Sequence, residues 1–221
     1  MSNFWKDTTA DNLDQLGADV NAADVTDDQR FGDFADSLAN RPTAAADDVD
    51  LSAIKALDAA FDGQEFLTIA RDCFYHVRQA RTTRNPNLDD AILSPQLEKE
   101  LDDVIAGDVA AHRHHLLPGL EIRTIVITSA AVTDGKLTLT TRLHLVGEEA
   151  ERDDSFKLVS GSEQAHEWDE DWTFWRDPSV DSSATDRQRT EMRQSQGGWF
   201  IAHKGWMVTA IERAGADATG R

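Results

Sequence analysis

The first half of the chain has apolar residues at helical spacing. Within 51–57 the apolar positions form one narrow stripe, which predicts a short helix. From 64 to 82 apolar residues recur every three or four positions, which predicts a second, longer helix. Ser94 and Pro95 are typical of a third helix start, because serine caps a helix and proline suits its first turn.

The apolar pattern then changes to alternation, which is typical of strands with one buried face. Asp134–Gly135 predicts a tight hairpin turn, and Ser160–Gly161 predicts another turn further on. The predicted strands cover 120–132, 137–151, 167–177 and 205–213. Helices followed by an antiparallel meander predict an α+β fold, with helices packed on one face of a curved, mainly antiparallel four-stranded sheet.

The stretch EWDEDWTFWRD, residues 167–177, is predicted to be a strand with two different faces. Trp172 and Phe174 share one face and are expected to point toward the helices. Trp175 points the other way and is a candidate surface contact. Arg176 is expected near the strand end, where it neutralises local acids. The acids Glu167, Asp169, Glu170 and Asp171 are expected to form an exposed acidic edge that discourages aggregation.

Large apolar residues from helices and strands are expected to converge inside this fold. They form either an ordinary core or the floor of an apolar pocket, since helices on a curved sheet commonly leave a pocket at the open end. The residues expected to form the pocket or core are Phe66, Phe74, Leu101, Leu139, Leu143, Trp172, Phe174 and Trp206.

Charge changes the picture at the surface and at the N-terminus. The chain has 41 acidic and 22 basic residues and a net charge of −19, which argues against a nucleic-acid partner. The same charge disfavours direct adsorption to anionic lipid. Residues 1–50 are rich in Asp and poor in apolar residues, which predicts a largely disordered acidic leader. The folded domain is expected at 51–213, followed by a flexible tail at 214–221.

The single cysteine and the lack of long apolar runs bound the cellular setting. Cys73 can form neither an internal disulfide nor a thiolate zinc site, and it lies on the apolar side of the long helix. No apolar run approaches the roughly 20 residues needed to span a bilayer. We therefore expect a cytoplasmic protein, with at most peripheral contact with the inner face of the membrane.

The histidine cluster His112–His115 is the one stretch that invites a metal interpretation. His112 and His115 can share a helix face, but a site needs three or four ligands. The alternative is a cationic helix C-terminus, and no metal is expected. Tyr75 with Asp72 and His76 can be read as an acid–base set, but no nucleophile motif accompanies it, and no catalytic residue is expected.

Several segments occur in an order that resembles the Tim44-like domain family. They are FDGQEFLTIARDCFYHVRQA, ILSPQLEKELDDVI, LEIRTIVITSA, EDWTFWRD and GWMVTAIER, and they span about 51–213. The resemblance implies a cone-like fold similar to nuclear transport factor two, with an apolar pocket. This family includes the C-terminal domain of the import-motor anchor of the mitochondrial inner-membrane translocase. Some bacterial relatives insert a cysteine-rich zinc ribbon, but the corresponding loop 178–198 has no cysteine, so no cofactor is expected.

The resemblance implies a non-enzymatic adaptor or scaffold that binds a protein segment or an apolar or lipid ligand through its pocket or sheet face. The alternative is a small-molecule-binding or enzymatic member of the same cone-like fold, since one fold hosts many functions. An enzyme needs at least two buried titratable groups that converge in the pocket. A binding module needs only shape and apolar surface.

Overall fold

The structure, a computed structural model, describes residues 49–85, 92–180 and 203–214. Three helices come first along the described chain: α2 (Ser52–Leu57), α3 (Gly63–Thr82) and α4 (Pro95–Ala110). The predicted leader, the tail after residue 214 and most of the loop 178–198 lie outside the described residues.

Both long helices begin at a side-chain cap, and the cap at Ser94 was predicted from the sequence. The Asp62 carboxylate accepts hydrogen bonds from the backbone N–H groups of Gln64 and Glu65 at 2.7 and 3.0 Å. The Ser94 hydroxyl accepts from the Leu97 N–H at 3.3 Å, with proline at the first helical position. These contacts satisfy donors that a helix start leaves unpaired, so they fix where α3 and α4 begin.

Five strands form one antiparallel sheet: β1 (Arg113–Leu116), β2 (Glu121–Thr133), β3 (Lys136–Asp153), β4 (Leu158–Arg176) and β5 (Met207–Arg213). Their order is β1-β3-β4-β5, and β2 also pairs with β3. β2 pairs with the first part of β3 and β1 with its last residues. The α+β class is confirmed, but the expected count of four strands was wrong, because Arg113–Leu116 is an edge strand.

The turns confirm one prediction and correct another. Asp134 and Gly135 have φ values of 52° and 73°, as the predicted β2–β3 hairpin requires. The expected turn at Ser160–Gly161 was wrong. Gly161 lies inside β4 and pairs with Ala150 of β3. The chain reverses earlier, over Asp153–Lys157. A Cβ atom at Gly161 would lie 2.1 Å from the Glu149 carbonyl oxygen, so glycine there permits close strand pairing rather than a turn.

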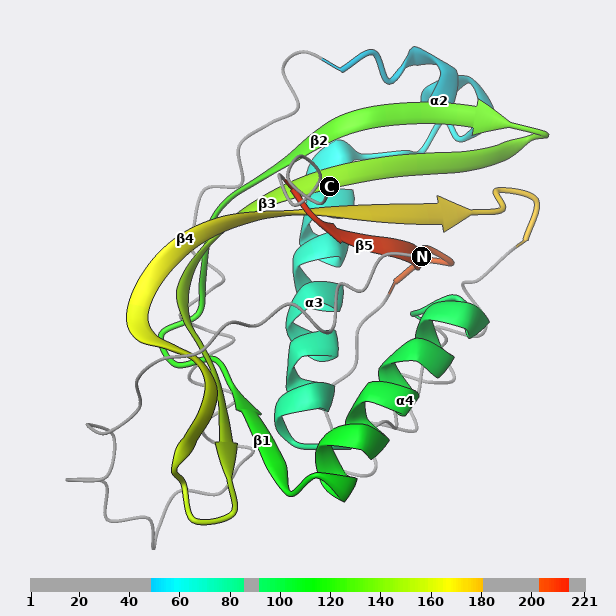
Figure 1. The fold of residues 1–221 in the computed structure, drawn as a ribbon. Coiled ribbons are helices and arrows are strands. Elements are labelled where there is room, and N and C mark those ends of the chain that lie inside the picture. Colours follow the sequence, from blue (N-terminus) through cyan, green and yellow to red (C-terminus); the bar gives the residue numbers. More distant parts are fainter. Residues whose placement is uncertain (1–48, 86–91, 181–202, 215–221) are drawn as a thin grey trace, which may run out of the picture.

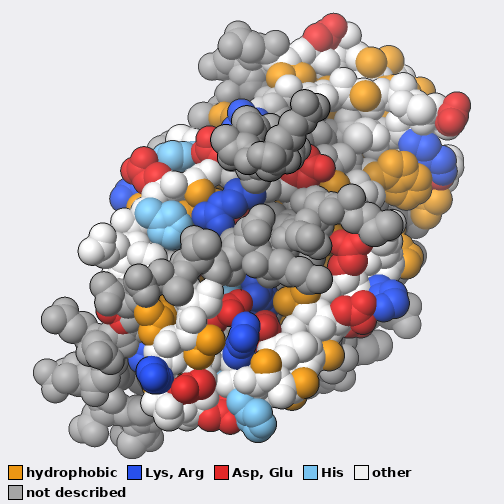
Figure 2. Space-filling view, viewed as in Figure 1, with side chains coloured by type: hydrophobic (Ala, Val, Ile, Leu, Met, Phe, Trp, Pro, Cys, Tyr) orange, Lys and Arg blue, Asp and Glu red, His pale blue; other side chains and the backbone are white. Residues whose placement is uncertain are grey.

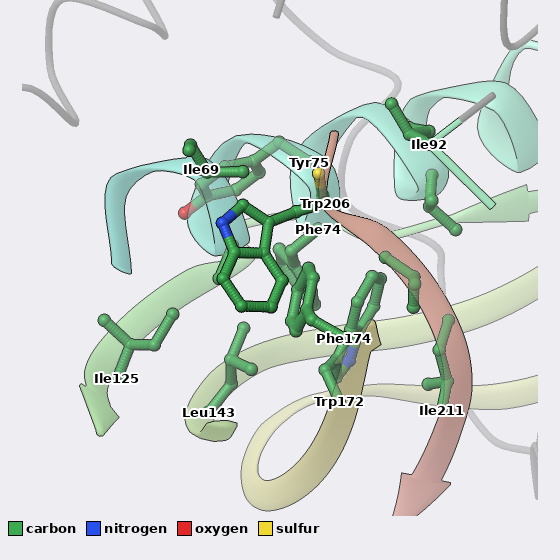
Figure 3. Packing of buried hydrophobic residues seen from close by; sticks show 14 of the residues in the cluster. Ile69, Phe74, Tyr75, Ile92, Ile125, Leu143, Trp172, Phe174, Trp206 and Ile211 are labelled. Atoms are coloured by element: carbon green, nitrogen blue, oxygen red, sulfur yellow. The ribbon is translucent and has the colours of Figure 1, made fainter. Parts of the chain in front are cut away.

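The core lies between helix α3 and the concave face of the sheet. Figure 1 shows β3 and β4 bending around this helix, with α4 beside it. The inward residues of β3 are buried at alternate positions, as predicted. Trp172 and Phe174 are fully buried and face α3, with Trp206 packed nearby (Figure 3). Cys73 is buried in the same cluster.

Candidate functional site

A pocket of about 160 Å³ opens beside the start of helix α3. Its apolar lining comes from Phe61, Phe66, Ile69 and Trp206, which belong to three separate segments. The loop before α3 carries Phe61, the first turns of α3 carry Phe66 and Ile69, and Trp206 precedes β5. Its other lining residues are Asp58, Ala60, Asp62, Glu65, Arg176 and Lys204.

The local sequence explains why two aromatic rings meet at this helix start. Asp62 is the N-cap of α3, so Phe61 stands just before the cap and Phe66 stands in the next turn. This spacing is that of a hydrophobic staple, in which these two positions pack together. The ring centroids of Phe61 and Phe66 lie 6.1 Å apart. The staple therefore sets one wall of the pocket.

Trp206 completes the aromatic floor. Its ring centroid lies 4.8 Å from that of Phe66 and 6.2 Å from that of Phe61. Phe174 packs edge-on against Phe66 at 5.3 Å and forms the layer beneath. Aromatic pairs at such distances are stabilising beyond their buried area, so the floor is a firm surface.

The rim of the pocket carries charges that are already paired. Arg176 Nη1 donates to Asp58 Oδ2 at 2.6 Å, and its guanidinium lies 5.8 Å from the Trp206 ring centroid. Lys204 forms an ion pair with Glu65. Backbone N–H groups of Glu65 and Gln64 hold the pKa of Asp62 below its usual value. Arg176 stands at the strand end as predicted, but its carboxylate partner comes from the α2–α3 loop rather than from its own strand.

A buried carboxylate lies deeper in the fold. The Glu170 side chain is only 1% exposed and forms an ion pair with Arg78 of α3. The indole Nε1 atoms of Trp168 and Trp172 donate to its two oxygens at 2.8 and 2.9 Å. The prediction that Glu170 belongs to an exposed acidic edge was therefore wrong. A carboxylate on the inward face of a strand needs such partners, and here they come from the helix and the same strand.

A second buried cluster of charged side chains connects α3 with α4 and β3. Arg81 donates from Nε to Asp108 at 3.3 Å and from Nη2 to Glu151 at 3.1 Å. His115 of β1 is 1% exposed, and neither ring nitrogen has a hydrogen-bond partner among the described residues. Burial first, and then the positive charges of Arg81 and Arg78, hold the pKa of His115 well below its ordinary value. The imidazole is therefore neutral near pH 7.

The structure separates the histidines of the cluster that invited a metal interpretation. Helix α4 ends at Ala110, so His112–His115 is not a helix C-terminus, and His112 and His115 do not share a helix face. His112 and His114 instead both contact Asp154, at 2.7 and 3.0 Å. Across 49–85, 92–180 and 203–214, no group of three His, Cys, Asp or Glu side chains is placed to hold a metal ion.

With this geometry described, the chain can be compared with known proteins. A family model described as the Tim44-like domain matches residues 48–199, more than half of the chain. The chain belongs to the Tim44-like domain family. Comparison with curated protein sequences gives no match. Among solved structures, the chain is similar to the crystal structure of the intermembrane space region of chloroplast protein ARC6. The sequence identity is 9% and the TM-score is 0.36, over 66% of this chain and 95% of that chain.

In this Tim44-like domain, some of the residues that were expected to form a pocket or core line the pocket, and the others lie in the core. Phe66 and Trp206 line the pocket, together with Phe61, which sequence reasoning missed. Trp175, the predicted surface contact, lies on the outer face, half-buried under Lys136 at 5.0 Å from its ring centroid. The residues that are fully buried in the core cluster and do not line the pocket are Phe74, Leu101, Leu139, Leu143, Trp172 and Phe174.

The missed pocket residues do have a signal in the sequence. Asp62 and Glu65 stand three positions apart at the helix start, as in a capping box, and aromatic residues flank this pair on both sides.

Among the helices of the described ranges, none is both long enough and apolar enough to cross a bilayer.

Proposed function

We propose that this Tim44-like domain is a non-enzymatic adaptor that binds a segment of a partner protein and seats one of its side chains in the pocket. The observation that supports this proposal is the aromatic floor formed by Phe61, Phe66 and Trp206 beside the start of α3. Aromatic residues that meet in a partly enclosed pocket are typical anchor sites of protein interfaces.

The size of the pocket favours a protein segment over a lipid. A cavity of about 150 Å³ in another protein accommodates benzene, so a pocket of about 160 Å³ has room for one side chain. A long acyl chain needs a channel through the core. The residues that would line such a channel, including Leu139, Trp172 and Phe174, are fully buried against their neighbours.

The charges at the rim favour binding over catalysis. Asp58 pairs with Arg176, Glu65 pairs with Lys204, and Asp62 caps helix α3. General acid–base catalysis needs titratable groups that are free to exchange protons with a substrate. These carboxylates instead stabilise the walls of the pocket, so they fit a recognition site better than a catalytic one.

The proposal is tested by blocking the pocket without removing its floor. Peptides would be selected from a random display library on the full chain, and their affinity measured by calorimetric titration. Ala60 lines the pocket and is exposed, so Ala60→Phe should fill it. We expect a loss of about tenfold or more in affinity, roughly 1.4 kcal/mol.

Ala59 provides the matched control, because it is exposed in the same loop but does not line the pocket. Ala59→Phe should leave the affinity within about twofold, since exposed positions away from a contact have small effects. Equal affinities for the Ala60→Phe variant and the natural chain would exclude this pocket as the binding site.

A further inference from the structure

Two rows of side chains on the outer face of the sheet carry no charge. Each row crosses four strands, because pairing sets β2, β3, β4 and β5 side by side. The first row is Ala131, Thr138, Trp175 and Met207, and the second is Ser129, Thr140, Thr173 and Ala210. Their chain neighbours, such as Leu139 and Phe174, are buried on the inner face, so these rows point outward. We call these two rows the neutral face.

The neutral face is unusual for this protein. Charged residues make up 29% of the chain. On the face of the molecule that Figure 2 draws, acidic and basic side chains are interspersed. Interface cores in other proteins are depleted in charged residues and enriched in tryptophan and methionine. The neutral face likewise lacks charged residues and contains Trp175 and Met207, and Lys136 from its border lies over the Trp175 ring at 5.0 Å from the centroid.

Paired charges border the neutral face at both ends. At one end Arg142 donates from Nε and Nη2 to the two carboxylate oxygens of Asp171, at 2.8 and 2.6 Å. At the other end Lys136 forms an ion pair with Asp177. The first border continues to Glu212, which pairs with Asp171 in the register of β4 and β5. Each border therefore presents both signs of charge.

We propose that the neutral face is the contact surface between two copies of this chain. A twofold interface brings the same patch of both copies together, so the patch must be complementary to itself. The rows bring no like charges into contact, and borders of mixed sign can meet the opposite sign on the other copy. Two sheets that pack face to face lie about 10 Å apart. This interface is independent of the pocket, which lies on the other side of β4.

The net charge predicts how such a dimer responds to salt. Each copy carries −19, so repulsion between copies acts over distance even though their contact surfaces are neutral. Salt screens that repulsion. The dimer should therefore become tighter as ionic strength rises, whereas an interface held by ion pairs would weaken.

The test uses charges placed at the centre of the neutral face. Thr173 lies beside Thr140 with their hydroxyl oxygens 3.3 Å apart, near the middle of the second row. Sedimentation analysis of the full chain should show a dimer for the natural chain and monomers for Thr173→Glu and Thr173→Lys separately. A mixture of the two variants should form a dimer again, because opposite charges then face each other.

Matched controls place the same charges elsewhere. Thr68 is exposed on helix α3, so Thr68→Glu and Thr68→Lys should remain dimers. Ser129→Glu and Ser129→Lys repeat the test from β2 if circular dichroism shows that a Thr173 variant does not fold. The proposal is overturned if the natural chain is monomeric at all accessible concentrations, if either single charge variant stays dimeric, or if the mixture stays monomeric.

Discussion

The side chain of His115 shows how its surroundings can change the chemistry of one residue. It stands on β1 opposite Glu151, and Arg78 and Arg81 approach it from α3. Buried polar groups normally have hydrogen-bond partners, and a neutral imidazole has one donor and one acceptor. Protonation would add a third positive charge to this interior. The fold therefore stabilises the neutral form of His115.

This environment predicts a loss of stability in mild acid. In the unfolded chain a histidine has a pKa of about 6.5, and in the fold the pKa of His115 is well below that value. Below about pH 6.5 the unfolded chain binds a proton that the folded chain does not bind, so folding becomes less favourable as pH falls. The contribution is at most about 1.4 kcal/mol for each pH unit.

Denaturant melts between about pH 7 and pH 5 measure this contribution, because histidine titrates in that range. His115→Leu removes the titrating group while keeping an apolar side chain. The free energy of unfolding of this variant should fall less steeply toward acid than that of the natural chain. Since all other groups titrate in both proteins, equal slopes would show that His115 does not resist protonation.

At the scale of single elements, two glycines with different surroundings make a matched prediction. Gly161 has a φ of 100° inside β4, where a Cβ atom would meet the Glu149 carbonyl oxygen. Gly107 lies in helix α4, with nothing within 4 Å of the equivalent position. Gly161→Ala should lower the free energy of unfolding by more than about 1 kcal/mol, because the backbone and the space both exclude alanine.

Gly107→Ala should raise the free energy of unfolding by about 0.5–1 kcal/mol, because alanine favours the helix interior. Thermal and denaturant melts of the two variants give both values. If Gly161→Ala leaves stability unchanged, then β3 and β4 are not as closely paired at this point as their register indicates.

The elements also show which parts of the fold sequence reasoning can reach. Helix α4 was predicted because its start has a local signal in Ser94 and Pro95, and the second half of β4 because its apolar residues alternate. Strand β1 was missed because four residues are too few for a pattern, and its partner is the distant end of β3. Gly161 was placed in a turn because its sequence does not reveal the approach of Glu149.

The candidate site was only partly predictable for a similar reason. Phe66 and Trp206 were chosen as large apolar residues, but whether such a residue lines a pocket or fills a core depends on contacts between distant segments. Glu170 was read as exposed because its partner Arg78 is 92 positions away. Alternation predicts which face a residue occupies, but it does not predict whether a charge on that face finds a partner.

At the scale of the whole molecule, net charge opposes compactness. The chain has 41 acidic and 22 basic residues, so the folded state concentrates a charge of −19. Salt screens this repulsion, since the Debye length falls from about 30 Å at 0.01 M to about 8 Å at 0.15 M. The melting temperature should therefore rise over that range of ionic strength.

Thermal melts in sodium chloride and potassium chloride at matched ionic strength measure this effect. The two salts should give the same rise, because screening depends on ionic strength rather than on the identity of the ion. A melting temperature that stays constant or falls would show that attractive ion pairs, such as those of Arg142 and Arg176, outweigh the net repulsion.

The buried pair of Arg78 and Glu170 has a consequence for how the sheet assembles. Residues two apart on β4 share a face, so a slip of two positions would still point tryptophans inward but would set Trp168 or Trp172 in the place of Glu170. A slip of one position would turn the indoles outward. The one-position slip would set Asp169 or Asp171 in the place of Glu170, so only the native alignment combines a carboxylate at the buried guanidinium with inward-facing indoles. A buried charge without its partner is strongly destabilising. The pair, together with the indoles that donate to Glu170, therefore makes misaligned pairings of β4 less stable than the native one.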